Sequence, residues 1–134
     1  MNEQNQRQIK IGELAEQAGV SHRTIHYYEK IGLMQPSKRE GMGYRYYDEE
    51  ALQRLWLIKR LKQLGLSLDE IKSVIDLYFE EPTGIKGKQK VLKLLQAHLE
   101  ETNIKLKELN RFRDELLTNI VRIELYIEEA TKNN

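Results

Sequence analysis

The last third of the chain carries an apolar residue at nearly every third or fourth position, and this repeat restricts the fold more than any other feature. From Leu92 to Ile127, nine of the eleven positions that step by alternating threes and fours are apolar. Such heptad spacing places them on one stripe of a continuous helix, which would be about 54 Å long at ~1.5 Å per residue. A small domain cannot cover so long a stripe, so we expect a second copy of the chain to pair with it. The apolar seam positions are Leu92, Leu95, Leu99, Leu106, Leu109, Leu116, Ile120, Ile123 and Ile127.

The same helix carries features beyond a simple two-stranded pairing. Arg113 occupies a seam position, where a charged residue costs stability but can fix the register of two paired helices. Further apolar residues lie off the seam and give the helix more apolar surface than a two-stranded coiled coil requires. The spacing leaves open whether the two helices run parallel or antiparallel.

The segment before residue 48 has the layout of a helix-turn-helix. Apolar or small residues recur at helical spacing through Ile11 to Ala18 and through Ser21 to Lys30. Ala15 is small enough for a second helix to cross closely, Gly19 can take the left-handed conformation that ends the first helix, and Ser21 can cap the second. This layout predicts two short helices that pack against each other across a tight turn.

A short hairpin is expected directly after the second helix. Turn-forming residues and then tyrosines, which favour a strand, lie between Met34 and Tyr47; they are Pro36, Gly41, Gly43, Tyr44, Tyr46 and Tyr47. We expect Tyr46 or Tyr47 to fill the core beneath the hairpin. From Val20 to Tyr47 the charge is locally positive, since only Glu29 and Glu40 oppose Arg23, Lys30, Lys38, Arg39 and Arg45. A helix-turn-helix followed by a basic wing predicts binding of duplex DNA.

Two more helices are expected between the hairpin and the heptad helix. Asp48 suits the N-cap of a helix from about Glu49 to Leu64, in which we expect Trp56 to be a core residue. Ser67 to Glu70 matches a capping box and begins the next helix, which is expected to end near Phe79. The predicted fold is mainly α, with a polar leader (1–8), a winged helix-turn-helix domain (9–79), a linker (80–87), a coiled-coil dimerisation helix (88–129) and a tail (130–134).

Composition excludes several kinds of site. Twenty-two Lys and Arg against twenty-one Asp and Glu give a net charge of only +1, so any attraction to DNA must be local. The chain has no cysteine, which excludes disulfides and thiolate metal ligands. His22 and His26 have the spacing of a two-His metal clamp, but the only other histidine is His98, so we expect no metal and no cofactor. We see no signal peptide or membrane-spanning run and expect a cytoplasmic protein.

Taken in order, these motifs resemble those of the MerR family of bacterial transcription regulators over nearly the full chain. The resemblance is carried by IGELAEQAGVS from Ile11, TIHYYEKIGL from Thr24, GYRYYDEEAL from Gly43, LKQLGLSLDEIK from Leu61 and the heptad helix. It implies a winged-helix domain, a dimer formed by an antiparallel coiled coil, and binding across an over-long promoter spacer. In that family the dimer often twists and bends the spacer, so that RNA polymerase engages both promoter elements. The missing cysteines set this chain apart from relatives that sense metals or oxidants through thiolates.

We expect the DNA contacts on the second helix and on the hairpin. The candidates are Ser21, His22, Arg23, Thr24, His26, Tyr27, Lys38, Arg39, Tyr44 and Arg45. The family usually carries a phosphate-binding Arg at the position of His26, so we expect either a weaker contact there or a different role. For Tyr28, which faces the first helix, core packing and DNA contact both remain open.

The predicted function is a dimeric, sequence-specific transcription regulator that binds an inverted repeat in promoter DNA and affects RNA polymerase through the promoter. One alternative is a coiled-coil adaptor whose head no longer binds DNA. Another is a DNA-bending accessory factor, such as a recombination directionality protein, although the long dimer helix argues against it. An enzyme finds little support, because no catalytic triad, phosphate-binding glycine loop or metal-ligand cluster is visible. The sequence identifies no small-molecule effector.

Overall fold

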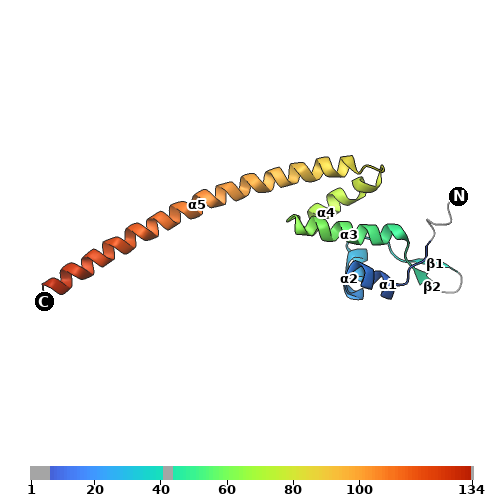
Figure 1. The fold of residues 1–134 in the computed structure, drawn as a ribbon, viewed down its shortest axis with the longest axis horizontal. Coiled ribbons are helices and arrows are strands. Elements are labelled where there is room, and N and C mark those ends of the chain that lie inside the picture. The colour runs from blue at the N-terminus through green and yellow to red at the C-terminus, as the bar shows by residue number, and fades with distance from the viewer. Residues whose placement is uncertain (1–6, 41–43, 134) are drawn as a thin grey trace. The chain divides into compact units, whose positions relative to one another are not determined.

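The structure, a computed structural model, describes residues 7–40 and 44–133. It is mainly helical with one small hairpin, as predicted (Figure 1). The elements are α1 (Ile11–Ala18), α2 (His22–Lys30), β1 (Lys38–Glu40), β2 (Tyr44–Tyr46), α3 (Glu49–Gln63), α4 (Leu68–Val74), the 3-10 helix η2 (Ile75–Phe79) and α5 (Ile85–Lys132). The chain divides into two units, Met1–Leu94 and Leu95–Asn134, which are described separately.

The helix ends in the first unit follow the predicted local chemistry. Gly19 has a φ of 70° and ends α1 in the left-handed conformation. The Ser21 hydroxyl accepts the backbone N–H of Thr24 at 3.0 Å and caps α2. Ser67 and Glu70 form the predicted capping box before α4. The boundaries of these short helices are therefore fixed locally by side chains at their ends.

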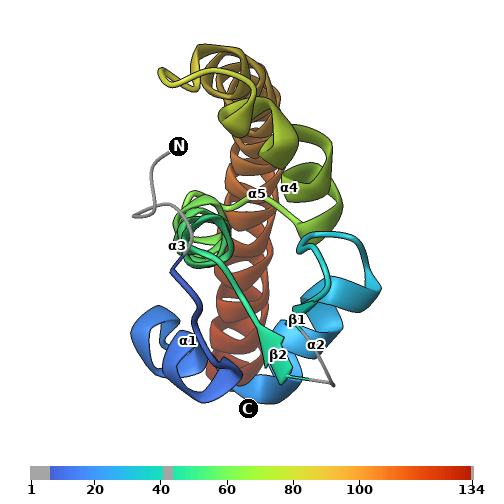
Figure 2. The same ribbon diagram turned by 90° about the vertical axis from the view of Figure 1, so that its right-hand side faces the viewer.

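The core of the first unit lies around α3. In both ribbon views α1 and α2 lie on one side of this helix and α4 lies on the other (Figures 1 and 2). Each helix contributes the residues of one face, as expected for amphipathic helices. The largest fully buried side chains are Ile9, Leu14, Ile25, Leu33, Leu52, Leu55, Ile58, Leu61, Ile71, Val74 and Ile75.

The predicted hairpin is present as an antiparallel pair of three-residue strands. Its register places Lys38 opposite Tyr46 and Arg39 opposite Arg45. The expected turn at Gly41 and Gly43 lies outside the described residues. Tyr47 follows β2, exchanges two backbone hydrogen bonds of 2.7 Å with Ile9, and is buried. The prediction that a tyrosine fills the core beneath the hairpin is thus confirmed for Tyr47.

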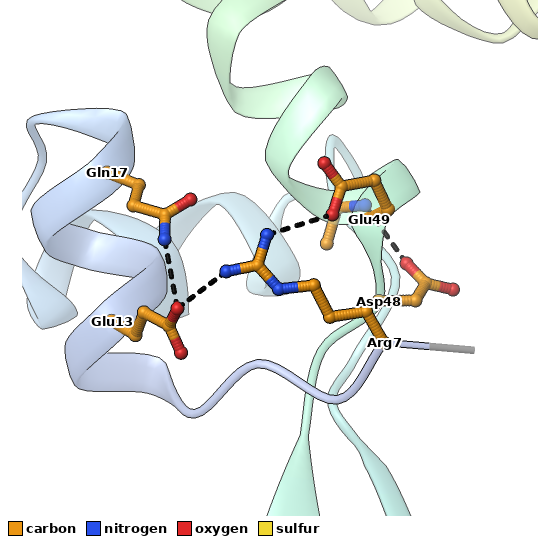
Figure 3. Close-up of polar contacts among 6 residues, drawn as sticks. Arg7, Glu13, Gln17, Asp48 and Glu49 are labelled. Carbon is orange, nitrogen blue, oxygen red and sulfur yellow. Dashed lines mark hydrogen bonds and ion pairs between the residues drawn. The ribbon is translucent and has the colours of Figure 1, made fainter. Parts of the chain in front are cut away.

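An arginine before α1 joins three parts of the first unit. Arg7 contacts Glu13 in the first turn of α1 at 2.7 Å and Glu49 in the first turn of α3 at 3.5 Å (Figure 3). Gln17, one turn further along α1, donates to the same Glu13 carboxylate at 3.0 Å. Arg7, which the sequence assigns to a polar leader, therefore takes part in the packing of the domain.

The prediction that Trp56 is a core residue was wrong. Its side chain lies outside the buried face of α3 and the residue is 48 % exposed. The indole N–H donates to the backbone carbonyl of Gln17 at 3.2 Å, which joins α3 to the end of α1. The expectation followed from residue type, whereas the helical period places Trp56 about 100° around the helix from Leu55, which is buried.

The junction between α4 and α5 also differs from the prediction. The expected fourth helix changes to the 3-10 helix η2 at Ile75, and α5 already begins at Ile85, inside the predicted 80–87 linker. Gly87 is a buried residue of the first turns of α5, not a linker residue. A Cβ at Gly87 would lie 2.3 Å from the Tyr78 ring, so this glycine allows the ring to pack directly on the helix backbone.

Candidate nucleic-acid interface

Helix α2 has one buried and one exposed face. Ile25 and Tyr28 are buried, so Tyr28 packs in the core, which was one of its two open interpretations. The opposite face points to solvent and carries two histidines, two basic residues and a tyrosine. These exposed residues are His22, Arg23, His26, Tyr27 and Lys30.

Two of the candidate residues on α2 serve its N-terminus. The hydroxyls of Ser21 and Thr24 lie 2.9 Å apart and are hydrogen-bonded to each other, in addition to the backbone cap. Thr24 is half-buried. These two side chains therefore position the first turn of α2, from which His22 and Arg23 project.

The hairpin places two arginines opposite each other. Arg39 and Arg45 are direct partners in the register, and both are exposed. Like charges at directly opposed positions of a hairpin are destabilising, and an anion between them relieves the repulsion. The pair is therefore suited to a phosphate. Tyr44 belongs to β2, and its side chain lies outside what the structure describes.

Lys38 has a partner within the protein. Its ammonium lies 2.9 Å from the Asp48 carboxylate at the N-terminus of α3. The hydrogen bond and the charge of Asp48 raise the pKa of Lys38. Part of its charge is thus already neutralised, and Lys38 is less available to DNA than the two arginines.

A carboxylate that was not among the candidates joins α2 to the base of the hairpin. The Tyr47 hydroxyl donates to Glu29 Oε1, and His26 Nδ1 lies 3.7 Å from the same oxygen. Burial, followed by the contact with Glu29, raises the pKa of the Tyr47 hydroxyl, so it keeps its proton. In the sequence, Glu29 stands out only as one of two acids in a basic segment.

Two lysines that were not among the candidates approach the ends of α2 from neighbouring helices. The ammonium of Lys59 lies 3.5 Å from the place a Cβ would take at Gly19, and that of Lys72 lies 3.3 Å from the corresponding place at Gly32. A groove of about 420 Å³ runs beside the end of α2; its lining is Tyr27, Lys30, Ile31, Gly32, Leu68, Asp69 and Lys72. Only the tertiary packing brings these cations next to α2.

Within residues 7–40 and 44–133, no three His, Cys, Asp or Glu side chains come together in a group that could hold a metal ion. Among the helices of those residues, none is both long and apolar enough to cross a membrane.

Comparisons with known proteins agree with this geometry. A family model described as MerR HTH family regulatory protein matches residues 9–77, and one described as MerR, DNA binding matches residues 52–118. The nodulation protein NolA of Bradyrhizobium elkanii is 36 % identical over 125 residues, which cover 92 % of this chain and 52 % of NolA. The chain therefore spans about half the length of that relative.

Two solved structures are similar to the chain. The transcription regulator PbrR691 from Ralstonia metallidurans CH34, in complex with lead(II), has a TM-score of 0.65 and 32 % identity, with 81 % of this chain and 82 % of that chain covered. HiNmlR, a MerR family regulator lacking the sensor domain and bound to promoter DNA, has a TM-score of 0.53 and 28 % identity. The match covers 81 % of this chain and 80 % of the HiNmlR chain. On the two family models and the similarity to PbrR691, the chain belongs to the MerR family of helix-turn-helix regulatory proteins.

Proposed function

We propose that the protein is a homodimeric, sequence-specific transcription regulator that binds an inverted repeat in promoter DNA. It acts by distorting the promoter spacer, and so affects RNA polymerase through the DNA. The observation that carries the proposal is the exposed face of α2, where His22, Arg23, His26, Tyr27 and Lys30 lie opposite the buried Ile25 and Tyr28. A recognition helix needs such a polar, basic face on a rigid support.

The hairpin supplies the second set of contacts. Arg39 and Arg45 are placed to bind phosphates beside the segment that α2 recognises, which fixes the orientation of the head on the duplex. The likeness to HiNmlR, whose structure contains promoter DNA, supports the same class of ligand here. Lys59 and Lys72 add positive charge next to the two ends of α2.

The dimer is formed by α5. From Leu99 onward the apolar seam residues are 45–64 % exposed in the single chain. A second copy of the same helix buries this stripe, and we propose the antiparallel pairing that the family resemblance implies. Two heads on one dimer then match the two halves of an inverted repeat.

The protein is a regulator and not an enzyme, and it acts in the cytoplasm, where a bacterial promoter is found. The matched relatives support the first statement, since they are named as regulators. The proposal requires no cofactor, and no effector is assigned.

The test is selection of bound fragments from fragmented genomic DNA by the purified protein, whose dimeric state is first checked by light scattering. The expected result is an enriched inverted repeat centred in an over-long promoter spacer, and its loss in the double variant Arg23→Ala/Tyr27→Ala. A folded dimer that enriches no motif would overturn the proposal in favour of a coiled-coil adaptor.

A further inference from the structure

The carboxylate of Glu29 lies between two side chains from different elements. On one side the hydroxyl of the buried Tyr47, at the base of the hairpin, donates a hydrogen bond to Oε1. On the other side Nδ1 of His26 lies 3.7 Å from the same oxygen. The Glu29 side chain is only 17 % exposed, whereas that of His26 is 57 % exposed. The Tyr47 hydroxyl thus holds the Glu29 carboxylate in place, and the more exposed imidazole of His26 lies next to this carboxylate.

The protonation state of an imidazole decides how many partners it can bridge. A neutral imidazole has one N–H and can donate to one acceptor, whereas an imidazolium has two and can donate to an acceptor on each side. His26 has Glu29 near Nδ1, and the proposed function brings DNA phosphates to the exposed side, where Nε2 can meet them. At 3.7 Å the contact with Glu29 is an ion pair only when the imidazole is charged, and only the imidazolium can pair with Glu29 and donate to a phosphate at the same time.

We propose that His26 takes up a proton from solvent when the protein binds DNA, and that Glu29 is the positioning residue that holds the imidazolium against the phosphate. The inference rests on the proposed function and deepens it, because it makes DNA affinity dependent on pH. No other chemistry is involved: a solvent proton is bound on association and released on dissociation.

Other charged groups share the surroundings of His26. His22, Arg23 and Lys30 lie on its exposed face of α2. From the hairpin side, Tyr47 stays neutral and the charge of Arg45 acts on its hydroxyl. DNA phosphates neutralise these cations when they bind, and their negative charge favours the proton on His26.

The expected effect has a definite size. Because each head takes up one proton when it binds, each half-site should lose up to about tenfold in affinity for each rise of one pH unit. A dimer with two engaged heads should show up to about twice that slope on a logarithmic scale.

The experiment measures the affinity of the intact protein for a fixed 40-base-pair duplex of mixed sequence, at constant low salt, from pH 5.5 to 8.5. Wild type is compared with His26→Gln, with Glu29→Gln, and with His98→Gln as a control histidine on α5. We expect the slope to be retained in His98→Gln and lost in His26→Gln. In Glu29→Gln the pH range over which the affinity changes should shift to lower pH.

A second readout does not depend on variants. The imidazole nitrogen chemical shifts of His26, in ¹⁵N-labelled wild-type protein at pH 7.5, should report one N–H in the free protein and two in the DNA complex. Equal pH slopes in wild type and His26→Gln, or a neutral His26 in the complex, would overturn the inference while leaving DNA binding intact. A folded dimer that binds the duplex at no pH would overturn the proposed function together with the inference.

Discussion

The guanidinium of Arg54 donates a hydrogen bond from Nη1 to the backbone carbonyl of Leu33, at 3.2 Å. Leu33 lies just after α2, and Arg54 lies on the buried side of α3. The same guanidinium binds the carboxylate of Asp76 in η2 and lies 4.9 Å from the centre of the Phe79 ring. One buried side chain therefore connects the segment after α2 to the 3-10 helix that precedes α5.

Replacing Arg54 should destabilise the first unit more than an ordinary substitution does. Arg54→Met keeps much of the apolar stem but leaves the Leu33 carbonyl without its donor and Asp76 without its partner. We expect a loss of roughly 2–3 kcal/mol in the free energy of unfolding, measured by urea denaturation. The control is Gln53→Met on the exposed side of α3, which should change stability by less than about 0.5 kcal/mol. Equal effects of the two variants would show that the Arg54 contacts add little.

Gly87 and Gly12 are both helical glycines, yet alanine should have opposite effects at the two positions. A Cβ at Gly12 meets nothing within 4 Å, so Gly12→Ala should stabilise the protein by about 0.5–1 kcal/mol, the usual gain from a better helix former. At Gly87 the Cβ would lie 2.3 Å from the Tyr78 ring, so Gly87→Ala must displace that ring and should cost on the order of 1–3 kcal/mol.

Thermal unfolding of the two alanine variants side by side measures this contrast. A third variant carries Gly87→Ala in a Tyr78→Ala background and is compared with Tyr78→Ala alone. In that background Gly87→Ala should cost little stability, because the ring that the Cβ would meet is absent. Stabilisation by Gly87→Ala in the wild-type background would mean that Tyr78 can move away at no cost.

The seam of α5 can be tested with two substitutions only two residues apart. Leu109→Glu buries a carboxylate in the proposed dimer interface, whereas Arg111→Glu changes the charge by a larger amount on the outer side of the helix. We expect Leu109→Glu to cost about 3 kcal/mol of dimerisation free energy per dimer, which weakens dimerisation by roughly 100-fold. Sedimentation equilibrium over a range of concentrations measures the monomer–dimer constant. Similar dissociation constants for both variants would exclude this seam as the interface.

His26→Arg should tighten DNA binding, because arginine is charged at every pH of interest and histidine is not. Where His26 of the wild-type complex is neutral, the logarithmic dependence of affinity on salt should steepen by about one unit per half-site, since one more phosphate is neutralised in each head; where the imidazolium already pairs with the phosphate, the salt slope should not change. The gain should be larger at pH 8 than at pH 6, because the imidazole has to take up a proton before it pairs with a phosphate, whereas arginine does not. Affinity and salt slope that match wild type at both pH values would remove His26 from the phosphate contacts.

Local signals in the sequence were sufficient for most of the helix boundaries. Gly19, Ser21, Ser67 and Glu70 act on the turn in which they lie, and the structure confirms each of them. The prediction failed where a residue depends on a distant neighbour. The sequence predicts that Gly87 belongs to a linker, and only the Tyr78 ring packed against it shows why a glycine occurs within a helix.

The sequence by itself determined the helix-turn-helix, the position of the wing, the heptad stripe and the family, because each follows from residue spacing along the chain. Only the tertiary structure decided that Arg54 is buried against Leu33 and that Glu29 lies between Tyr47 and His26. Such contacts join residues that are far apart in the chain or lie on different elements. Their formation depends on how the helices and the hairpin pack, which a periodic pattern of apolar residues does not specify.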